Sequence, residues 1–197
     1  MSSRNATAES VAATLRSPET QRATPGWRRK ANRLPAENYG GPNAYLLTLV
    51  TSGRVVRFSN KELVASLVER LRAACRSEGA QLLAYVFMPN HLHLLLQGAD
   101  RTELPRLMKR FKQESAFDFK RRTGEALWQK SYHDHALRRE EDLNDVVRYV
   151  AANPVRGGLV SDWTQYPFTG GDLLDGALDG DLKVAATGGV SAGDAPL

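Results

Sequence analysis

The sequence predicts an α+β domain with a ferredoxin-like arrangement: a four-stranded antiparallel sheet with two helices on one face, followed by a further C-terminal helix. The first observation is the order of the elements, because apolar strand-like runs and helical repeats alternate as β-α-β-β-α-β-α. The second is a pair of apolar runs that flank Pro89-Asn90, a dipeptide that favours a tight turn. With right-handed crossovers, the first six elements form this sheet.

The first strand and the first helix follow from local propensities. Residues 44–51 are rich in β-forming residues and predict a buried strand. Ser59 and Asn60 can cap a helix over residues 61–77, in which apolar side chains recur at helical spacing. Gly79 is predicted to end this helix, because glycine adopts the left-handed conformation that closes many helices.

The hairpin and the second helix come next. The two hairpin strands cover residues 82–87 and 91–96, and both are almost entirely apolar. The second helix is predicted between Thr102, as its cap, and Gly124. Its first turn holds Pro105, which is tolerated there because the first amides of a helix have no partner within it.

The last two elements are a strand over residues 128–137 and a helix that begins with Glu140, Glu141 and Asp142. The strand is expected at an edge of the sheet. The three acidic residues lie in the first turn of the helix, where the helix dipole favours negative charge. The helix is predicted to end near Asn153, because Pro154 disfavours the α conformation in the residue before it.

The chain of 197 residues is predicted to hold one domain with two tails. Residues 1–32 lack an apolar period and are predicted to be a disordered basic arm, the domain covers residues 33–170, and residues 171–197 are predicted to be a disordered acidic tail. The net charge is +5, yet the acidic tail has one Lys/Arg against five Asp/Glu. A basic body suits a polyanion such as nucleic acid, and a solvated Arg-rich surface would account for the charge equally well.

Composition also bears on the compartment. The sequence has no run of about eighteen apolar residues and no apolar core of a secretory signal near its start, so we expect no membrane partner. The single Cys75 excludes an internal disulfide and fits a reducing compartment. These features predict a cytoplasmic protein.

All four histidines occur in two His-x-His pairs, His91 with His93 and His133 with His135. Residues two apart on a strand project to the same face, so each pair could form half of a metal site. Either pair could bind a metal ion, and so could all four together, while hydrogen-bonded histidines without a metal are the alternative. We favour the first pair, because its strand is the more apolar. If Leu92 faces the helices, this pair lies on the open face of the sheet.

Tyr149 lies on the predicted third helix, four residues before Asn153, so both side chains lie on one helix face. A half-buried aromatic with a solvated hydroxyl is the simple interpretation. As a nucleophile, a phenol with a pKa near 10 needs a nearby cation or base. A divalent ion can polarise a phosphate and orient it for in-line attack, which on DNA yields a phosphotyrosine and a free hydroxyl.

Two segments carry a resemblance to a known family. Residues 88–94, Met-Pro-Asn-His-Leu-His-Leu, resemble the histidine–hydrophobe–histidine motif of the single-tyrosine HUH transposases. Residues 149–160, Tyr-Val-Ala-Ala-Asn-Pro-Val-Arg-Gly-Gly-Leu-Val, resemble their tyrosine helix. The variant is that of the REP-associated tyrosine transposases, relatives of the IS200/IS605 transposases. The similarity extends in the same order over about residues 33–170.

The resemblance implies a metal-dependent single-strand DNA endonuclease and strand transferase that acts on hairpin DNA. His91 and His93 would hold Mg²⁺ or Mn²⁺, with Asn153 as third ligand where insertion-sequence relatives use Gln. Tyr149 would form a 5′-phosphotyrosine and release a 3′-hydroxyl. The resemblance also implies a monomer, with a dimer as the alternative.

Two basic clusters are candidates for binding the DNA backbone, because Lys and Arg supply the salt-dependent part of such binding. One is in the N-terminal arm and one on the second helix; their members are Arg28, Arg29 and Arg33, and Lys109, Arg110 and Lys112. An inert tail and a solvated helix face are the alternatives.

Two further functions remain open at this point. A domesticated DNA-binding protein would keep the fold without cutting DNA. A small metal hydrolase would use both His-x-His pairs as ligands and would not need Tyr149.

Overall fold

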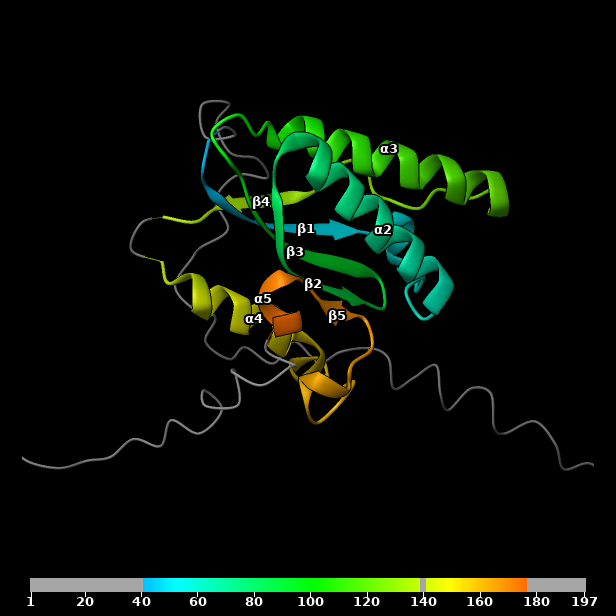
Figure 1. Cartoon of the computed structure of the whole chain (residues 1–197). Helices are drawn as coiled ribbons and strands as arrows, with labels where there is room; N and C mark the ends of the chain where they lie inside the picture. Colours follow the sequence, from blue (N-terminus) through cyan, green and yellow to red (C-terminus); the bar gives the residue numbers. More distant parts are fainter. Residues whose placement is uncertain (1–40, 139–140, 177–197) are drawn as a thin grey trace, which may run out of the picture. The chain divides into compact units, whose positions relative to one another are not determined.

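The computed structural model describes residues 41–138 and 141–176 (Figure 1). The predicted N-terminal arm, the first residues of the predicted domain and residues 177–197 lie outside the described residues. Within the described ranges, no helix has both the length and the apolar character that a membrane crossing requires.

A five-stranded antiparallel sheet lies at the centre of the fold, with the strand order β4-β1-β3-β2-β5. The first four strands have the predicted ferredoxin-like order, and their bounds are Ala44–Val50 for β1, Gln81–Met88 for β2, His91–Gln97 for β3 and His133–Ala136 for β4. The prediction of four strands was wrong by one. The added strand β5, Thr169–Gly170, has only two residues, which is too short for a recognisable alternation of side chains.

Alternation along β3 separates two apolar layers. Leu92, Leu94 and Leu96 pack in the larger core, with side chains of α2 (Lys61–Glu78) and α3 (Leu104–Thr123). Leu95 faces the other way, into a second core formed with α4 (Leu143–Arg156). Figure 1 shows α2 and α3 on one side of the sheet and α4 on the other. The predicted helix layer is therefore confirmed, and α4 covers part of the face that was expected to be open.

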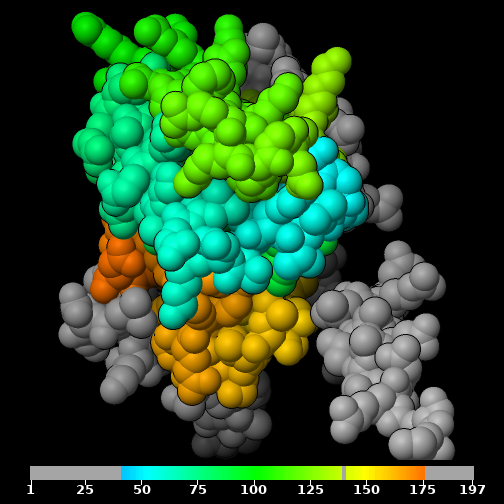
Figure 2. Space-filling model, turned by 90° about the vertical axis from the view of Figure 1, so that its right-hand side faces the viewer, coloured from blue at the N-terminus to red at the C-terminus, as the bar shows by residue number. Residues whose placement is uncertain are grey.

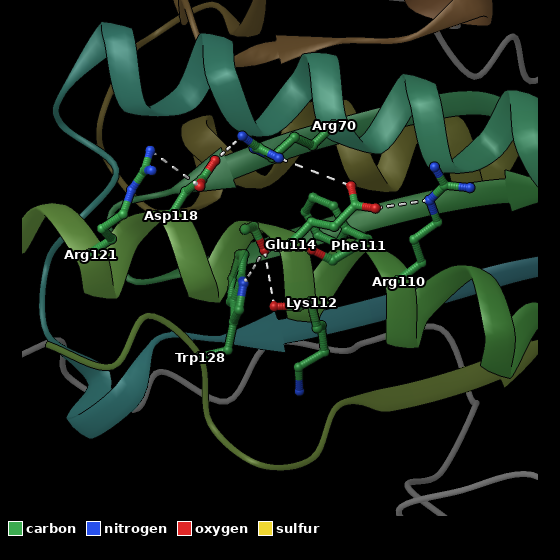
Figure 3. Close-up of polar contacts among 9 residues, drawn as sticks. Arg70, Arg110, Phe111, Lys112, Glu114, Asp118, Arg121 and Trp128 are labelled. Atoms are coloured by element: carbon green, nitrogen blue, oxygen red, sulfur yellow. Dashed lines mark hydrogen bonds and ion pairs between the residues drawn. The ribbon is translucent and has the colours of Figure 1, made fainter.

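The two helices of the first layer lie side by side (Figure 2). The helix α2 begins as predicted, because the Asn60 side chain accepts a hydrogen bond from the Leu63 amide, 2.8 Å away. Arg70 of α2 pairs with Asp118 of α3 and lies 4.0 Å from a Glu114 carboxylate oxygen (Figure 3). These partly exposed ion pairs link the outer surfaces of helices whose inner faces are held by the core.

The start of α3 differs from the prediction. Thr102 does not cap the helix, which begins at Leu104 without a side-chain cap. Its hydroxyl accepts from the Ala99 amide at 2.8 Å and donates to the carbonyl of Glu78 at 3.1 Å. The buried Thr102 therefore links the end of α2 to the loop before α3.

The predicted fourth strand, residues 128–137, is shorter than expected, because side chains of α3 bind its first part. The indole Nε1 of Trp128 donates to Ser115 Oγ at 2.9 Å, and both residues are buried. Lys112 Nζ donates to the carbonyls of Gln129 and Lys130 at 2.8 and 3.0 Å. Trp128 still forms an antiparallel bridge with Thr51, and the Gln129 amide donates to the carbonyl of Val50 at 2.8 Å. The predicted strand is therefore interrupted after Gln129, and its continuous part, residues 133–136, pairs with β1 at the predicted edge position.

The described chain extends to Gly176, beyond the predicted end of the domain at residue 170. A short helix α5, Asp172–Gly176, buries Leu174 against the second core. Its acidic residues pair with Arg72 of α2, at 3.6 Å from Asp172 and 3.1 Å from Asp175. Part of the acidic segment is therefore attached to the domain.

We expect Ser115→Ala to lower the free energy of unfolding by about 1–3 kcal/mol, because it leaves the buried indole N–H of Trp128 without an acceptor. Urea unfolding of the two proteins measures the difference. The control is Ser131→Ala, whose side chain is exposed and which should change stability by less than about 0.5 kcal/mol. Equal effects of the two substitutions would contradict this account.

Candidate functional site

The β2–β3 hairpin presents two histidines on the face of the sheet that α4 partly covers. The turn is Pro89-Asn90, as predicted, and His91 and His93 are the first and third residues of β3. Their rings lie nearly perpendicular to each other, with centroids 4.9 Å apart. Because β3 lies between β1 and β2, neither histidine backbone is at a sheet edge. The prediction that the pair faces away from α2 and α3 is confirmed.

Neighbouring side chains orient both imidazoles. Asn90 donates through Nδ2 to the carbonyl of Arg54 at 3.3 Å, so its Oδ1 faces His91 Nδ1 at 2.8 Å. His91 therefore carries its proton on Nδ1 and keeps Nε2 as a lone pair. On β1, the Thr48 hydroxyl oxygen lies 3.0 Å from His93 Nδ1 and can accept a hydrogen bond from it, which would leave Nε2 of His93 unprotonated as well. Metal-binding histidines commonly have such a second hydrogen bond.

The environment keeps both imidazoles neutral. Burial lowers the pKa of His93 to about 3, assisted by the charges of His91 and Arg156. Burial also lowers the pKa of His91, with a smaller effect from the charge of Arg54. A neutral imidazole with an unprotonated Nε2 is the form that binds a metal ion, so the pair fits a divalent cation.

The helix α4 brings Tyr149 to the same place. Val147, Val150 and Ala151 are buried in the second core, which includes Met88 of β2 and Leu95 of β3. Tyr149, on the flank of this apolar stripe, is half-buried, and its ring centroid lies 6.2 Å from that of His93. The docking occurs within one chain, so the tyrosine and the histidines of a single molecule form the site.

Asn153 has a structural role besides its predicted one. The prediction that the helix ends near Asn153 was wrong, because the helix continues through Pro154 to Arg156. Pro154 has no N–H for the carbonyl of Val150, and Asn153 Nδ2 donates to that carbonyl at 3.3 Å and to the carbonyl of Tyr149 at 2.7 Å. The amide oxygen is the end of the side chain that a cation would use.

The second histidine pair lies apart from the first. His133 and His93 both pair with Thr48, on opposite sides of β1, so a whole strand separates them. His133 is exposed, and His135 Nε2 lies 2.9 Å from a carboxylate oxygen of Glu141. Within the described ranges, no three His, Cys, Asp or Glu side chains are grouped closely enough to hold a metal ion. The alternative of one four-histidine site was therefore wrong.

The predicted DNA-binding residues are divided by the structure. Arg28, Arg29 and Arg33 lie outside the described residues. Arg110 pairs with Glu114 at 3.0 Å, on the side of α3 toward Arg70, whereas the Lys112 side chain extends away from α2 (Figure 3). Lys109 and Lys112 line a surface cavity of about 420 Å³, together with Lys130 and four other residues: Pro105, Met108, Gln113 and Tyr132. This cavity belongs to the α3 layer and not to the histidine face.

Four residues near the site were not singled out from the sequence. Thr48 is one of two threonines in the predicted strand at residues 44–51, and its place in the middle of an apolar run could have drawn attention to it. Asn90 directly precedes His91, but a polar residue in a turn is ordinarily explained by the turn. Arg156 lies in the segment that resembles the tyrosine helix, although no role followed from that. Arg54 gives no local signal of a site, because only the fold brings it close to the histidines.

The family model described as "Transposase IS200 like" matches residues 43–153, more than half of the chain. The chain belongs to the IS200-like transposase family. The matched range contains both histidines of the hairpin, Tyr149 and Asn153.

Two individual proteins are similar to this chain. One, from Haemophilus influenzae, bears the name "Putative REP-associated tyrosine transposase" and is 21% identical over 141 residues, which is 64% of this chain and 77% of the relative. The other is a solved structure of a REP-associated tyrosine transposase bound to a REP hairpin. It is 20% identical, with a TM-score of 0.54, and the match covers 74% of this chain and 82% of that one. This structural likeness supports the fold.

We expect the metal-free protein to lose stability as the pH falls below 6.5. The pKa of His93 is about 3 in the folded state against 6.5 as its ordinary value, so the unfolded chain takes up a proton that the folded chain does not. The stability from this residue is complete above pH 6.5 and is lost progressively as the pH falls toward 3, by at most about 1.4 kcal/mol per pH unit. Urea unfolding in the presence of a chelator, at several pH values from 7.5 to about 5, measures the loss. His93→Gln should lose less stability over the same range; an equal loss would contradict the assignment.

Proposed function

We propose that this chain is a metal-dependent single-strand DNA endonuclease and strand transferase that acts on hairpin DNA through a 5′-phosphotyrosine intermediate. The observation that carries the proposal is the contact between the rings of Tyr149 and His93, 6.2 Å between centroids. A phenol and two neutral imidazoles are thereby held together on a helix and a strand that pack against each other. Membership of a transposase family supports the same conclusion.

His91 and His93 would hold Mg²⁺ or Mn²⁺ through Nε2, and the amide oxygen of Asn153 is the proposed third ligand. When bound, such an ion polarises a phosphate and stabilises the negative charge that develops on it. The residues of the chain prepare this site in advance, because Asn90 and Thr48 orient the imidazoles and burial keeps them neutral. Little reorganisation is then needed when a cation binds.

Tyr149 is the proposed nucleophile. Its phenol oxygen forms a bond to the phosphorus while the bond from phosphorus to the 3′ oxygen breaks. The phenol proton leaves, and the departing 3′ oxygen takes up a proton, so the products are a 5′-phosphotyrosine and a 3′-hydroxyl. The new phosphodiester keeps the energy of the old one, and attack by a DNA hydroxyl can therefore rejoin a strand.

Hairpin DNA with single-stranded flanks is the proposed substrate. The similar solved structure contains a REP hairpin, and the domain between residues 45 and 170 has nineteen Lys/Arg against fourteen Asp/Glu. An excess of positive charge attracts the DNA backbone without selecting a sequence. We expect a monomer to suffice, because one chain contains both the histidine pair and the tyrosine.

We expect Tyr149→Phe to abolish covalent capture of DNA, because the phenylalanine ring packs alike but has no nucleophilic oxygen. The assay incubates the protein with Mn²⁺ and single-stranded oligonucleotides that fold into hairpins, and looks for an adduct that survives denaturation. Tyr166→Phe is the matched control, since the Tyr166 hydroxyl donates to the carbonyl of Phe87 at 2.9 Å and should affect stability only.

The same assay distinguishes the other functions. A small metal hydrolase would keep its activity with Tyr149→Phe and lose it with His133→Ala. A DNA-binding protein that does not cut would bind the oligonucleotides reversibly, without forming an adduct that survives denaturation. Either result would contradict the proposed mechanism.

We expect Asn90→Ala to weaken Mn²⁺ binding about 10–100-fold, because His91 loses the acceptor that fixes its tautomer and ring orientation. Isothermal titration of the DNA-free protein measures this affinity, with His91→Ala as the reference for loss of a ligand. Asn144→Ala, which removes an exposed amide on α4, is the control and should leave the affinity unchanged. An unchanged affinity in Asn90→Ala would show that the hydrogen bond does not support the metal site.

A further inference from the structure

The loop after β1 has an unusual backbone beside the histidine hairpin. Gly53 and Arg54 both have positive φ angles, 63° and 55°. Arg54 is the only residue other than glycine with a positive φ within the described ranges. This conformation costs about 1–2 kcal/mol in an arginine, so the surrounding contacts must hold it.

Those contacts attach the loop to the turn that carries the histidines. The Thr51 hydroxyl donates to the carbonyl of Val55 at 2.7 Å and approaches that of Asn90 at 3.0 Å, and Thr51 itself is fully buried. The amide of Arg57 donates to the carbonyl of Pro89 at 2.9 Å. The loop is therefore a firm support for Arg54, and the carbonyl of Arg54 is the group that orients Asn90.

A second arginine lies beside the proposed nucleophile. Arg156, in the last turn of α4, has its Cζ atom 4.9 Å from the centroid of the Tyr149 ring. Stacking on an aromatic face leaves the edge of the guanidinium, with its N–H donors, available to a ligand. The helix reaches this residue only because it continues through Pro154.

These residues form one continuous row. Arg156 stacks on Tyr149, whose ring meets that of His93, and His93 meets His91. His91 is hydrogen-bonded to the Asn90 side chain, which donates to the backbone carbonyl of Arg54. Arginine stands at each end, and the groups of the proposed chemistry lie between. Both arginines are exposed, and neither has a carboxylate within 4.0 Å among the residues that the structure describes.

We infer that Arg54 and Arg156 form a phosphate clamp, in which each guanidinium binds the DNA backbone on one side of the phosphate that Tyr149 attacks. This inference rests on the proposed function. Guanidinium groups match phosphate oxygens in geometry and can bind two of them at once. The clamp holds the strand along the row, so that the scissile phosphate lies over the histidines and near the phenol.

The electrostatics of the site agree with this arrangement. Arg54 lies close enough to His91, and Arg156 close enough to His93, for its positive charge to act on that ring. Neither arginine has a carboxylate partner among the described residues, so the two cations attract an anion such as a phosphodiester.

The test measures how DNA binding depends on salt. The parent protein is Tyr149→Phe, which keeps the ring beneath Arg156 but does not cut, and it is studied in a chelator. The probe is a fluorescent oligonucleotide that folds into a hairpin with single-stranded flanks, and its anisotropy gives Kd at several salt concentrations. Loss of one phosphate contact should reduce the slope of log K against log salt by about 0.7.

We expect Arg54→Gln and Arg156→Gln each to reduce the slope by about 0.7, and the double variant to reduce it by about twice that amount. Arg54→Gly should have the same effect on binding while relieving the positive φ, so a loss of binding there does not arise from misfolding. Arg106→Gln is the control, because this exposed arginine of α3 already pairs with Glu78 at 3.3 Å and should leave the slope unchanged.

The outcomes separate the clamp from the proposed function. If the protein with Tyr149 intact forms the DNA adduct, and the slopes of Arg54→Gln and Arg156→Gln equal that of the parent, the clamp is wrong and the proposed function stands. If the reduction appears equally in Arg106→Gln, the effect is one of overall charge and the clamp is also wrong. If the parent binds no hairpin at any salt concentration, both proposals fail.

Discussion

The side-chain alternation of β3 is the constraint on which the rest of the site depends. Leu92, Leu94 and Leu96 are almost completely buried against α2 and α3. Exposing any one of these side chains to water would cost about 2 kcal/mol of folding free energy. A shift of the register by one residue would exchange the two faces of the strand, so the large core fixes which side His91 and His93 occupy. The histidines are thus positioned by residues that take no part in their chemistry.

The second core positions α4, and with it Tyr149, on the other face of the sheet. It is smaller, and it holds α4 against the sheet through a narrow apolar stripe that includes Val147, Val150 and Ala151. Tyr149 lies at the margin of this stripe, half-buried, where its ring meets His93. Pro154 would ordinarily interrupt the helix, but the Asn153 side chain donates to the carbonyl that the proline leaves unpaired, and the helix continues to Arg156. The same asparagine would hold a cation through its oxygen, so one residue serves the helix and the proposed ligand set with opposite ends of its amide.

The arginines of this protein differ in whether a carboxylate lies near them, and this depends on where each one stands in the fold. On α3, Arg110 and Arg121 lie near carboxylates of their own helix, and Arg70 bridges to that helix from α2. Arg54 and Arg156, in contrast, lie at the two ends of the row of site residues and have no carboxylate partner among the described side chains. The net charge of a segment therefore does not show which of its arginines can bind a phosphate, because several arginines of the helix layer are already paired with carboxylates. The strained loop that carries Arg54 also supports Asn90, so substrate contact and histidine orientation are proposed to share one structural element.

Much of this protein can be read from the sequence, because the determining forces are local or periodic. The alternation of apolar residues predicted the hairpin, its two faces and the pairing of His91 with His93, and helical spacing placed Tyr149 and Asn153 on one side of α4. The order of the elements was enough for the sheet of β1 to β4. The sequence could not show that the strand after Trp128 is interrupted before it continues at His133, or that a two-residue strand and Leu174 complete the other edge, since these depend on hydrogen bonds and packing between distant segments. Nor could it show that Arg54 and Arg156, about a hundred residues apart in the chain, both lie close to the same pair of histidines. Tertiary structure alone decides that neighbourhood, because a side chain's partners are set by how the layers pack and not by its place in the sequence.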